Sequence, residues 1–209
     1  MSEIIVFGAG GRAGRAAVQE ALLRGHRLTA VVRDPAAHGD LAAAGVRVVA
    51  GDVTDAGTVA ALATGADAVV HAAADLTAPD FFATAARSLL DGMAAAGVSR
   101  LVSVGLASVL ETASGALLMD TDGYPQEYRG FYLSHAAGTE VLRAADPAVD
   151  WVVVSPSGDF DHGGPRTGGY GLAAADAASR ISYADFAIAL LDEVDTPKHH
   201  RDHVGVKAV

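Results

Sequence analysis

The sequence predicts an α/β fold built on one doubly wound parallel sheet, and two observations lead to this prediction. Short apolar runs rich in Val, Ile and Ala alternate with helical segments along most of the chain. Such alternation is typical of right-handed strand–helix–strand units, which build parallel sheets. The runs are also apolar at successive positions, as expected for strands that helices cover on both faces. We therefore expect residues 1–209 to form a single domain of this kind.

The first strand and the loop after it are the most informative stretch. An apolar run at residues 4–7 leads into a glycine-rich segment, which reads as G-x-G-x-x-A or as G-x-x-G-x-x-G. An alanine-rich helix is expected behind it, at residues 16–23. Glycines permit a tight turn and a close backbone approach to a ligand, and the start of a helix favours a pyrophosphate. The arrangement predicts a dinucleotide site, and its residues are Gly8, Gly10, Gly11, Arg12, Ala13 and Gly14.

The remaining elements follow in order. Five further strands are expected at residues 27–32, 46–50, 66–70, 100–104 and 151–154, with helices at 35–44, 55–64, 80–96 and 127–145. Thr54 or Asp55 can cap the second of these helices, and residues 105–125 are expected to form a loop.

The last part of the chain is expected to form a small C-terminal extension. One short strand is predicted near Tyr170, a helix capped by Ser182 extends to about Val194, and residues 203–206 are expected to be an edge strand. We expect residues 157–209 to form much of the substrate side.

Composition excludes several classes of function. The formal net charge of −10 argues against nucleic-acid and anionic-membrane partners. The chain has no cysteine, which excludes disulfide and thiolate chemistry, and the acids around His162 lack the spacing of a metal site. With no leader sequence or long apolar run visible, we expect a cytoplasmic monomer or homodimer that acts on a small molecule.

The second strand ends at the position that distinguishes the two nicotinamide cofactors. Arg33 lies about twenty residues past the glycine loop, where an arginine accommodates the 2′-phosphate of NADP. Arg12 can add a second charge-assisted contact to that phosphate. The neighbouring Asp34 can instead serve the ribose of NAD, and a surface Arg–Asp pair is a third interpretation. We favour NADP over NAD.

The ends of the third and fourth strands supply further candidates. Asp52 can accept a hydrogen bond from the adenine amino group while Val53 covers the ring, although Asp52 can also serve as a helix cap. His71 can contact the cofactor or be a satisfied buried histidine. The small Ala72 and Ala73 would let the cofactor lie against the chain.

Several segments resemble a known family. These segments are GAGGRAG at 8–14, VVRDP at 31–35, GDV at 51–53 and SP at 155–156. They resemble the atypical short-chain dehydrogenase/reductases, in particular the small NAD(P)H-binding proteins of the NmrA-like and NADH-flavin reductase-like types. The resemblance extends over residues 3–206 and implies a Rossmann fold, with Ser155 and Pro156 close to the cofactor.

The resemblance also suggests catalytic residues. The family usually pairs a tyrosine with a lysine four residues later, and the tyrosine corresponds to Tyr132 while the lysine position is Ala136. The usual proton relay is therefore broken. His135 is the alternative acid, base or carbonyl ligand, and Tyr128 lies one helical turn before Tyr132 as another donor.

The loop after the fifth strand normally carries a hydroxyl that orients a carbonyl group. Ser103 lies within the strand and is expected to face the core. We favour Ser108, because we expect it to be better exposed.

The predicted function is the reduction of a small carbonyl compound, quinone or flavin by NADPH. Flavins and quinones fit the missing lysine best, because they need little proton donation from the protein. Two alternatives stay open: a regulator that senses the redox state of NADP, as NmrA-like proteins do, and an isomerase or dehydratase that retains its cofactor. The fold alone does not separate them.

Overall fold

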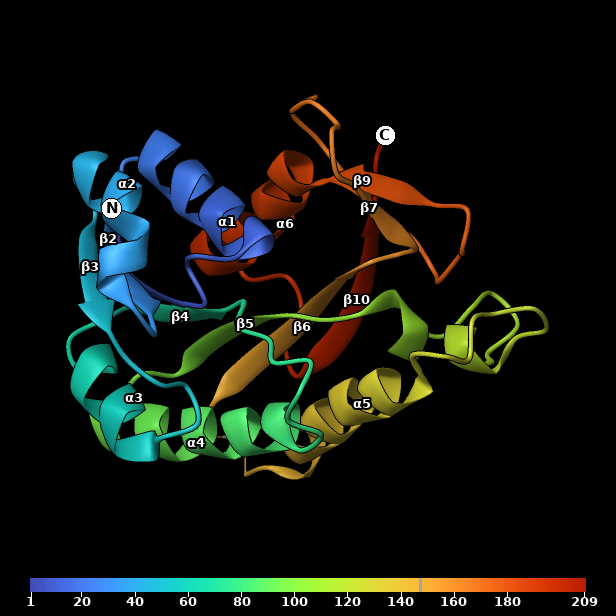
Figure 1. Ribbon diagram of the computed structural model, residues 1–209, viewed down its shortest axis with the longest axis horizontal. Coiled ribbons are helices and arrows are strands. Elements are labelled where there is room, and N and C mark those ends of the chain that lie inside the picture. Colours follow the sequence, from blue (N-terminus) through green and yellow to red (C-terminus); the bar gives the residue numbers. More distant parts are fainter. Residues whose placement is uncertain (147) are drawn as a thin grey trace.

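The computed structural model describes residues 1–146 and 148–209, and an eight-stranded sheet forms its centre (Figure 1). The strands are β1 (Glu3–Phe7), β2 (Arg27–Val32), β3 (Arg47–Ala50), β4 (Ala68–His71), β5 (Arg100–Val104), β6 (Asp150–Pro156), β8 (Gly171–Leu172) and β10 (Asp202–Lys207). Their order is β3-β2-β1-β4-β5-β6-β10-β8, and every pair is parallel except β10 and β8. The predicted doubly wound parallel sheet is confirmed.

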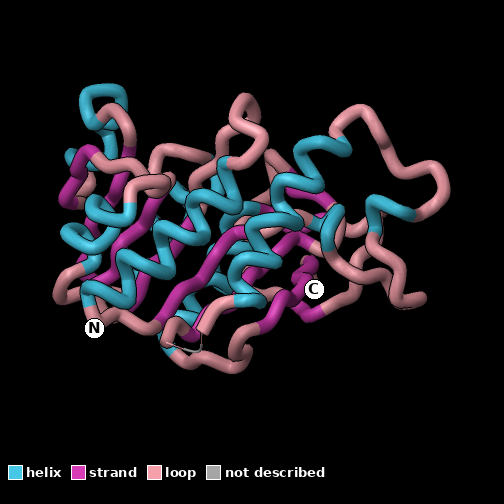
Figure 2. The backbone as a smooth tube through the Cα atoms, turned by 90° about the horizontal axis from the view of Figure 1, so that it is seen from below, coloured by secondary structure: helices cyan, strands magenta, loops and turns pink. Residues whose placement is uncertain are grey.

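Helices cover both faces of this sheet (Figures 1 and 2). The helices are α1 (Arg12–Leu23), α2 (Gly39–Ala43), α3 (Ala56–Ala63), α4 (Phe81–Ala96), α5 (Arg129–Ala144) and α6 (Tyr183–Asp195). On one face α1 packs against α6, and on the other α4 lies between α3 and α5. The caps explain two of the starts: Asp55 accepts a hydrogen bond from the backbone N–H of Thr58, and Ser182 accepts one from that of Asp185.

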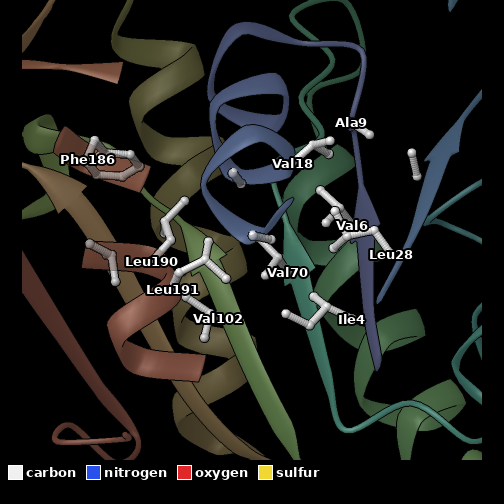
Figure 3. Close-up of a cluster of buried hydrophobic side chains, with 14 of the residues drawn as sticks. Ile4, Val6, Ala9, Val18, Leu28, Val70, Val102, Phe186, Leu190 and Leu191 are labelled. Atoms are coloured by element: carbon white, nitrogen blue, oxygen red, sulfur yellow. The ribbon is translucent and has the colours of Figure 1, made fainter. Parts of the chain in front are cut away.

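The first strand shows how the sequence supports two helical layers. Ile4 and Val6 point into the cluster under α1 and α6, while Ile5 and Phe7 point into the cluster under α3, α4 and α5. Figure 3 shows the first cluster, in which Leu190 of α6 lies close to the sheet. Both faces of β1 are therefore buried, which accounts for its unbroken apolar run.

A buried ionic cluster joins β5 to the end of α6. The guanidinium of Arg100 donates hydrogen bonds of 2.8 Å to the carboxylates of Asp150 and Glu193. Arg100 and Glu193 are only 7% and 3% exposed. Their charges thus depend on each other for compensation.

The order of the strands reverses beside β1. From β1 the chain builds β2 and β3 on one side, then crosses to β4, β5 and β6 on the other. A crevice opens at such a switch point, beyond the carboxyl ends of the strands, and it is the usual place for a ligand.

The structure corrects several expectations at the C-terminal end. The strand at 203–206 is not at the edge: β10 lies between β6 and the short β8, which forms the edge. Two strands were not predicted, β7 (Asp159–Asp161) and β9 (Arg180–Ser182), which pair in parallel as a second small sheet. Each has only three residues, which is too short for a recognisable pattern, so its pairing depends on distant parts of the chain.

Two other segments differ in detail from the prediction. The single helix expected at 35–44 is divided into a 3-10 turn, η1 (Pro35–His38), and the short α2. The predicted loop at 105–125 contains two 3-10 turns, η2 (Ala107–Val109) and η3 (Leu118–Asp120), and extends beyond the end of the sheet (Figure 1).

Candidate functional site

A cleft of about 700 Å³ lies at the carboxyl ends of the central strands, where the strand order reverses. Residues of the glycine loop form one side of it, and the ends of β2, β3 and β4 continue the wall. This volume falls in the range of ordinary cofactor and ligand sites. The predicted cofactor residues that line it are Gly8, Gly10, Gly11, Arg12, Ala13, Arg33, Asp52, Val53, Ala72 and Ala73.

Two glycines of the loop are required by packing alone. A Cβ on Gly8 would lie 2.3 Å from the backbone nitrogen of Ala73, and the φ of Gly8 is +78°. A Cβ on Gly14 would lie 2.2 Å from the carbonyl oxygen of Gly8. Close contacts of β1 with β4 and with α1 therefore explain Gly8 and Gly14 without any ligand.

The other two glycines differ in the space beside them at the start of α1. A Cβ on Gly10 would meet the imidazole of His38 at 2.5 Å, and one on Gly11 would have the carbonyl oxygen of Gly8, 3.5 Å away, as its nearest neighbour. Gly11 is the N-cap residue and has no side chain with which to cap the helix. The first-turn N–H groups and the positive end of the helix dipole therefore suit an anionic group such as a pyrophosphate.

The end of β2 separates its two charged residues. Arg33 lines the cleft, its side chain is 78% exposed, and its guanidinium lies 3.3 Å from the carboxylate of Asp75. Asp34 is the N-cap of η1, where its carboxylate accepts a 3.0 Å hydrogen bond from the backbone N–H of Ala36. Asp34 is not among the residues that line the cleft.

The ends of β3 and β4 differ in their access to the cleft. Asp52 lines it, and one carboxylate oxygen of Asp52 accepts hydrogen bonds from the backbone and the hydroxyl of Thr54. His71 is only 5% exposed and lies beneath the cleft, with its Nδ1 3.0 Å from the hydroxyl of Ser103. Burial lowers the pKa of His71 to about 4, so this histidine is neutral at neutral pH.

Two groups of aromatic side chains line the cleft. Phe82 stacks on the imidazole of His135 with a centroid distance of 3.6 Å, and Phe131 contacts the same ring edge-on. From the C-terminal extension, Phe160 and Tyr183 stack at 4.1 Å. All five line the cleft.

The extension is joined directly to the glycine loop. Arg12 at the start of α1 lies 2.8 Å from Nδ1 of His162, which is 3.2 Å from the hydroxyl of Tyr183. These contacts hold the C-terminal extension against the start of α1, on the glycine-loop side of the cleft.

His135 is the one predicted catalytic residue that lines the cleft. Burial, together with repulsion of a second positive charge by His71 and His203, lowers its pKa to about 3. The imidazole is therefore neutral at neutral pH, and it can donate one hydrogen bond and accept another.

The tyrosines predicted to be catalytic lie outside the cleft lining. Tyr132 is 7% exposed and packs with Tyr124 and Ala136 against the segment after β5, and burial raises its pKa. Tyr128 caps α5 and is 60% exposed. The face of α5 that carries Phe131 and His135 points to the cleft. The face that carries Tyr132 and Ala136, one residue further along the helix, does not.

The prediction that Ser108 is well exposed is wrong. Ser108 is 1% exposed and its hydroxyl lies 2.9 Å from that of Tyr124, inside the packed segment after β5. Ser155 is fully buried, with its hydroxyl 2.8 Å from Nε2 of His203, and Pro156 ends β6 beside it. Neither Ser155 nor Pro156 is among the cleft-lining residues.

The sequence analysis missed Phe82, Phe131, Tyr183 and His38, all of which line the cleft. One signal was available: Phe131 lies four residues before His135, so the two share a helical face. Nothing comparable marks Tyr183, whose place depends on the pairing of β7 with β9.

In the described residues, no three His, Cys, Asp or Glu side chains are grouped as metal ligands. No helix within residues 1–146 and 148–209 is both long and apolar enough to cross a membrane.

The glycine loop, the uncapped helix and the cleft at the switch point define a nicotinamide-dinucleotide-binding protein of Rossmann type. The profile of the NAD(P)H-binding family matches residues 8–197, and the chain belongs to that family. The predicted resemblance to NAD(P)H-binding, NADH-flavin reductase-like proteins is thereby confirmed.

Individual relatives span the whole chain. The uncharacterized protein YwnB of Bacillus subtilis is 33% identical in an alignment 213 residues long, which covers 98% of this chain and 97% of YwnB. A candidate epimerase of Bacteroides thetaiotaomicron is 32% identical with a TM-score of 0.85, over 100% of this chain and 97% of that one. A candidate NADH-flavin reductase of Streptococcus pneumoniae is 28% identical with a TM-score of 0.80, over the full length of both chains. Taken together, the family and the reductase-named neighbour of Streptococcus pneumoniae support an oxidoreductase.

Proposed function

We propose that this chain is an NADPH-dependent reductase of planar conjugated acceptors, namely flavins or quinones. The observation that carries the proposal is the aromatic lining of the cleft. Phe82 and Phe131 flank the neutral imidazole of His135, and the stacked rings of Phe160 and Tyr183 line the cleft as well. Flat apolar walls suit a planar ring system, and a single polar donor can orient it.

The residues of the cleft fit the bound cofactor. The backbone at Gly10 and Gly11 and the start of α1 would hold the pyrophosphate, while Ala72 and Ala73 leave space along the end of β4. When bound, the nicotinamide ring supplies a hydride.

The preference for NADPH is argued from the end of β2. Arg33 is exposed and paired only at the surface with Asp75, and such a pair is worth little, so Arg33 can turn to a 2′-phosphate. Arg12 at the start of α1 offers a second positive charge. The carboxylate of Asp34 is engaged in capping η1, which leaves it poorly placed to bind a ribose hydroxyl.

The role of His135 follows from its neutral state. A buried neutral imidazole donates a hydrogen bond to the oxygen or nitrogen on which negative charge develops as the hydride arrives. Because its pKa is about 3, His135 carries no extra proton to give at neutral pH. Acceptors whose reduced anions are stable, such as flavins and quinones, need no such proton in the hydride-transfer step.

The cofactor preference is tested by titration of the protein with NADPH and NADH. The Arg33→Ala variant should bind NADPH roughly 10- to 100-fold more weakly and NADH unchanged, because it loses charge-assisted hydrogen bonds to the phosphate. Arg47→Ala removes an exposed arginine at the start of β3, outside the cleft lining, and is the matched control. Equal affinities of the unaltered protein for the two cofactors would overturn the NADPH preference.

The reaction is tested by steady-state oxidation of NADPH with a flavin, a quinone and a simple ketone. We expect turnover with the first two, and a loss of about 100-fold in kcat for His135→Phe, which retains the ring but no donor. Tyr132→Phe is the control, because Tyr132 packs away from the cleft. An unchanged kcat in His135→Phe would remove this residue from the mechanism.

A cofactor-binding regulator is the second candidate. It is favoured by the positions of Tyr132 and Ala136, which leave the described lining of the cleft without the tyrosine–lysine pair of the wider family. Tight NADPH binding without turnover of any acceptor would support the regulator and contradict the reductase.

A further inference from the structure

A second, much smaller cavity lies beneath the cleft. Its volume is about 20 Å³, which is enough for one water molecule. Phe82, Val104, Gly105 and His135 border both the cavity and the cleft, so the imidazole of His135 stands between them.

One residue that lines the cavity has a polar atom without a partner among the described residues. Nε2 of His71 is buried and has no hydrogen-bond partner among the described residues, although Nδ1 of the same ring is 3.0 Å from the hydroxyl of Ser103. His71 is 95% buried (5% exposed) and lines the cavity, as does Ser103. An unpaired buried ring nitrogen in a largely apolar site carries a desolvation penalty, which a bound water removes.

Two further polar groups complete the surroundings of such a water. His135 lines the cavity, and neither of its ring nitrogens has a hydrogen-bond partner among the described residues. Thr139, one turn further along α5, also lines the cavity, and its hydroxyl donates to the carbonyl of His135 at 3.3 Å while keeping its own lone pairs. Two to four polar partners are what a buried water requires.

We propose that this cavity binds one water molecule that bridges Nε2 of His71 to the inward ring nitrogen of His135, and that His71 is thereby a positioning residue for His135. The water accepts a hydrogen bond from His71 and donates one to His135. The proton of the His135 ring then resides on the other nitrogen, which faces the cleft. Ser103 fixes the tautomer of His71 by donating to Nδ1.

The consequence for catalysis rests on the proposed function. A neutral histidine helps the reduction only in the tautomer that donates into the cleft. The chain Ser103–His71–water–His135 selects that tautomer without adding a charge to the site, and without contact between His71 and either reactant.

The test uses the whole protein labelled with ¹⁵N-histidine, without cofactor or acceptor, so that it does not depend on turnover. Long-range ¹H–¹⁵N NMR spectra report the tautomer of each ring. We expect His135 to be a single neutral tautomer in the unaltered protein and a mixture of both tautomers in His71→Phe. His26→Asn replaces another buried histidine, at the opposite end of β2, and should leave the His135 signals unchanged.

Ser103→Ala is a second, smaller perturbation in case His71→Phe does not fold. It removes the partner of Nδ1, so His135 should again become a mixture of tautomers. A His135 signal that stays a single tautomer in the folded variants would overturn the proposal. A mixture already present in the unaltered protein would overturn it as well.

A kinetic measurement follows if the protein turns over a flavin or quinone. We expect His71→Phe to lower kcat by about 10-fold or more at nearly constant KM for the acceptor, and His71→Gln, whose amide keeps a donor near the cavity, to restore most of it. Equal kcat in His71→Phe and the unaltered protein would contradict the positioning role. Failure of every acceptor would refute the proposed function, while the NMR result would still decide the water bridge.

Discussion

Replacing Gly14 by alanine tests whether the glycine loop is required by the fold itself. Gly14 is the third residue of α1, and in a helix an alanine gains about 1 kcal/mol over glycine through its higher propensity. At this position, however, the new Cβ would lie 2.2 Å from the carbonyl oxygen of Gly8 and 2.9 Å from the Cα of Ala9. These are backbone atoms that cannot turn aside, so β1 and α1 must separate.

The expected outcome is a net loss of stability. Overpacking costs about 1 to 3 kcal/mol and more where backbone must move, so we expect Gly14→Ala to lower the free energy of unfolding by about 2 kcal/mol or more. Gly130 is the matched control: it is the second residue of α5, and a Cβ there has no neighbour within 4 Å. Gly130→Ala should be neutral or stabilising by up to about 1 kcal/mol.

Urea unfolding followed by circular dichroism gives the free energy of unfolding of both variants, provided that its slope against urea concentration is the same in the two. Gly14→Ala should lower the midpoint, whereas Gly130→Ala should leave it unchanged or raise it. A Gly14→Ala protein as stable as the unaltered one would refute the packing argument for the loop.

Two further predictions concern buried ionisable side chains. Arg100→Met should lower the free energy of unfolding in urea by about 3 kcal/mol or more, because Glu193 loses its buried partner. The control is Arg27→Met at the exposed pair with Glu3, which should change this free energy by less than about 1 kcal/mol. Similar values for both variants would contradict the role given to burial. The folded pKa of His71 is about 4, below the ordinary value of about 6.5, so stability is complete above about pH 6.5 and is lost as the pH falls toward 4. His71→Phe should therefore reduce the stability difference between about pH 7.5 and about pH 5.5 by about 1 to 2 kcal/mol, and an identical pH dependence in both proteins would rule out a neutral buried His71.

The parts of the fold that depend on local sequence could be predicted well. The apolar run of β1, the glycines that follow and the caps at Asp55 and Ser182 each act over a few residues, and all appear where the sequence places them. The parallel pairing of the main strands follows from their alternation with helices. By contrast, β7 and β9 are three-residue segments whose pairing joins parts of the chain about twenty residues apart.

The incorrect predictions of catalytic residues have a physical cause as well. Successive residues of a helix are about 100° apart, so an offset of one residue decides which side chain faces the cleft. The family pattern points to Tyr132 and Ala136, yet the helix directs Phe131 and His135 into the cleft. The sequence names His135 as an alternative but contains no local signal of the angle at which α5 packs.

The C-terminal extension has a clear structural part in the cleft. Phe160 of β7 and Tyr183 of α6 form a stacked pair that faces the glycine loop, and His162 links the extension to Arg12. Phe160 also packs against Phe186 and the buried cluster under α1 and α6, so the stacked pair connects this wall of the cleft to the main core.

The central claim is that this cleft brings NADPH together with a planar acceptor. An anaerobic single-turnover experiment tests it most directly: NADPH-loaded protein is mixed with oxidised flavin, and the absorbance of both compounds is followed. We predict that one flavin is reduced for each NADPH oxidised, and that His135→Phe slows this step by about 100-fold while NADPH binding is retained. Bound NADPH that stays reduced in the presence of flavin and of quinone would contradict the account.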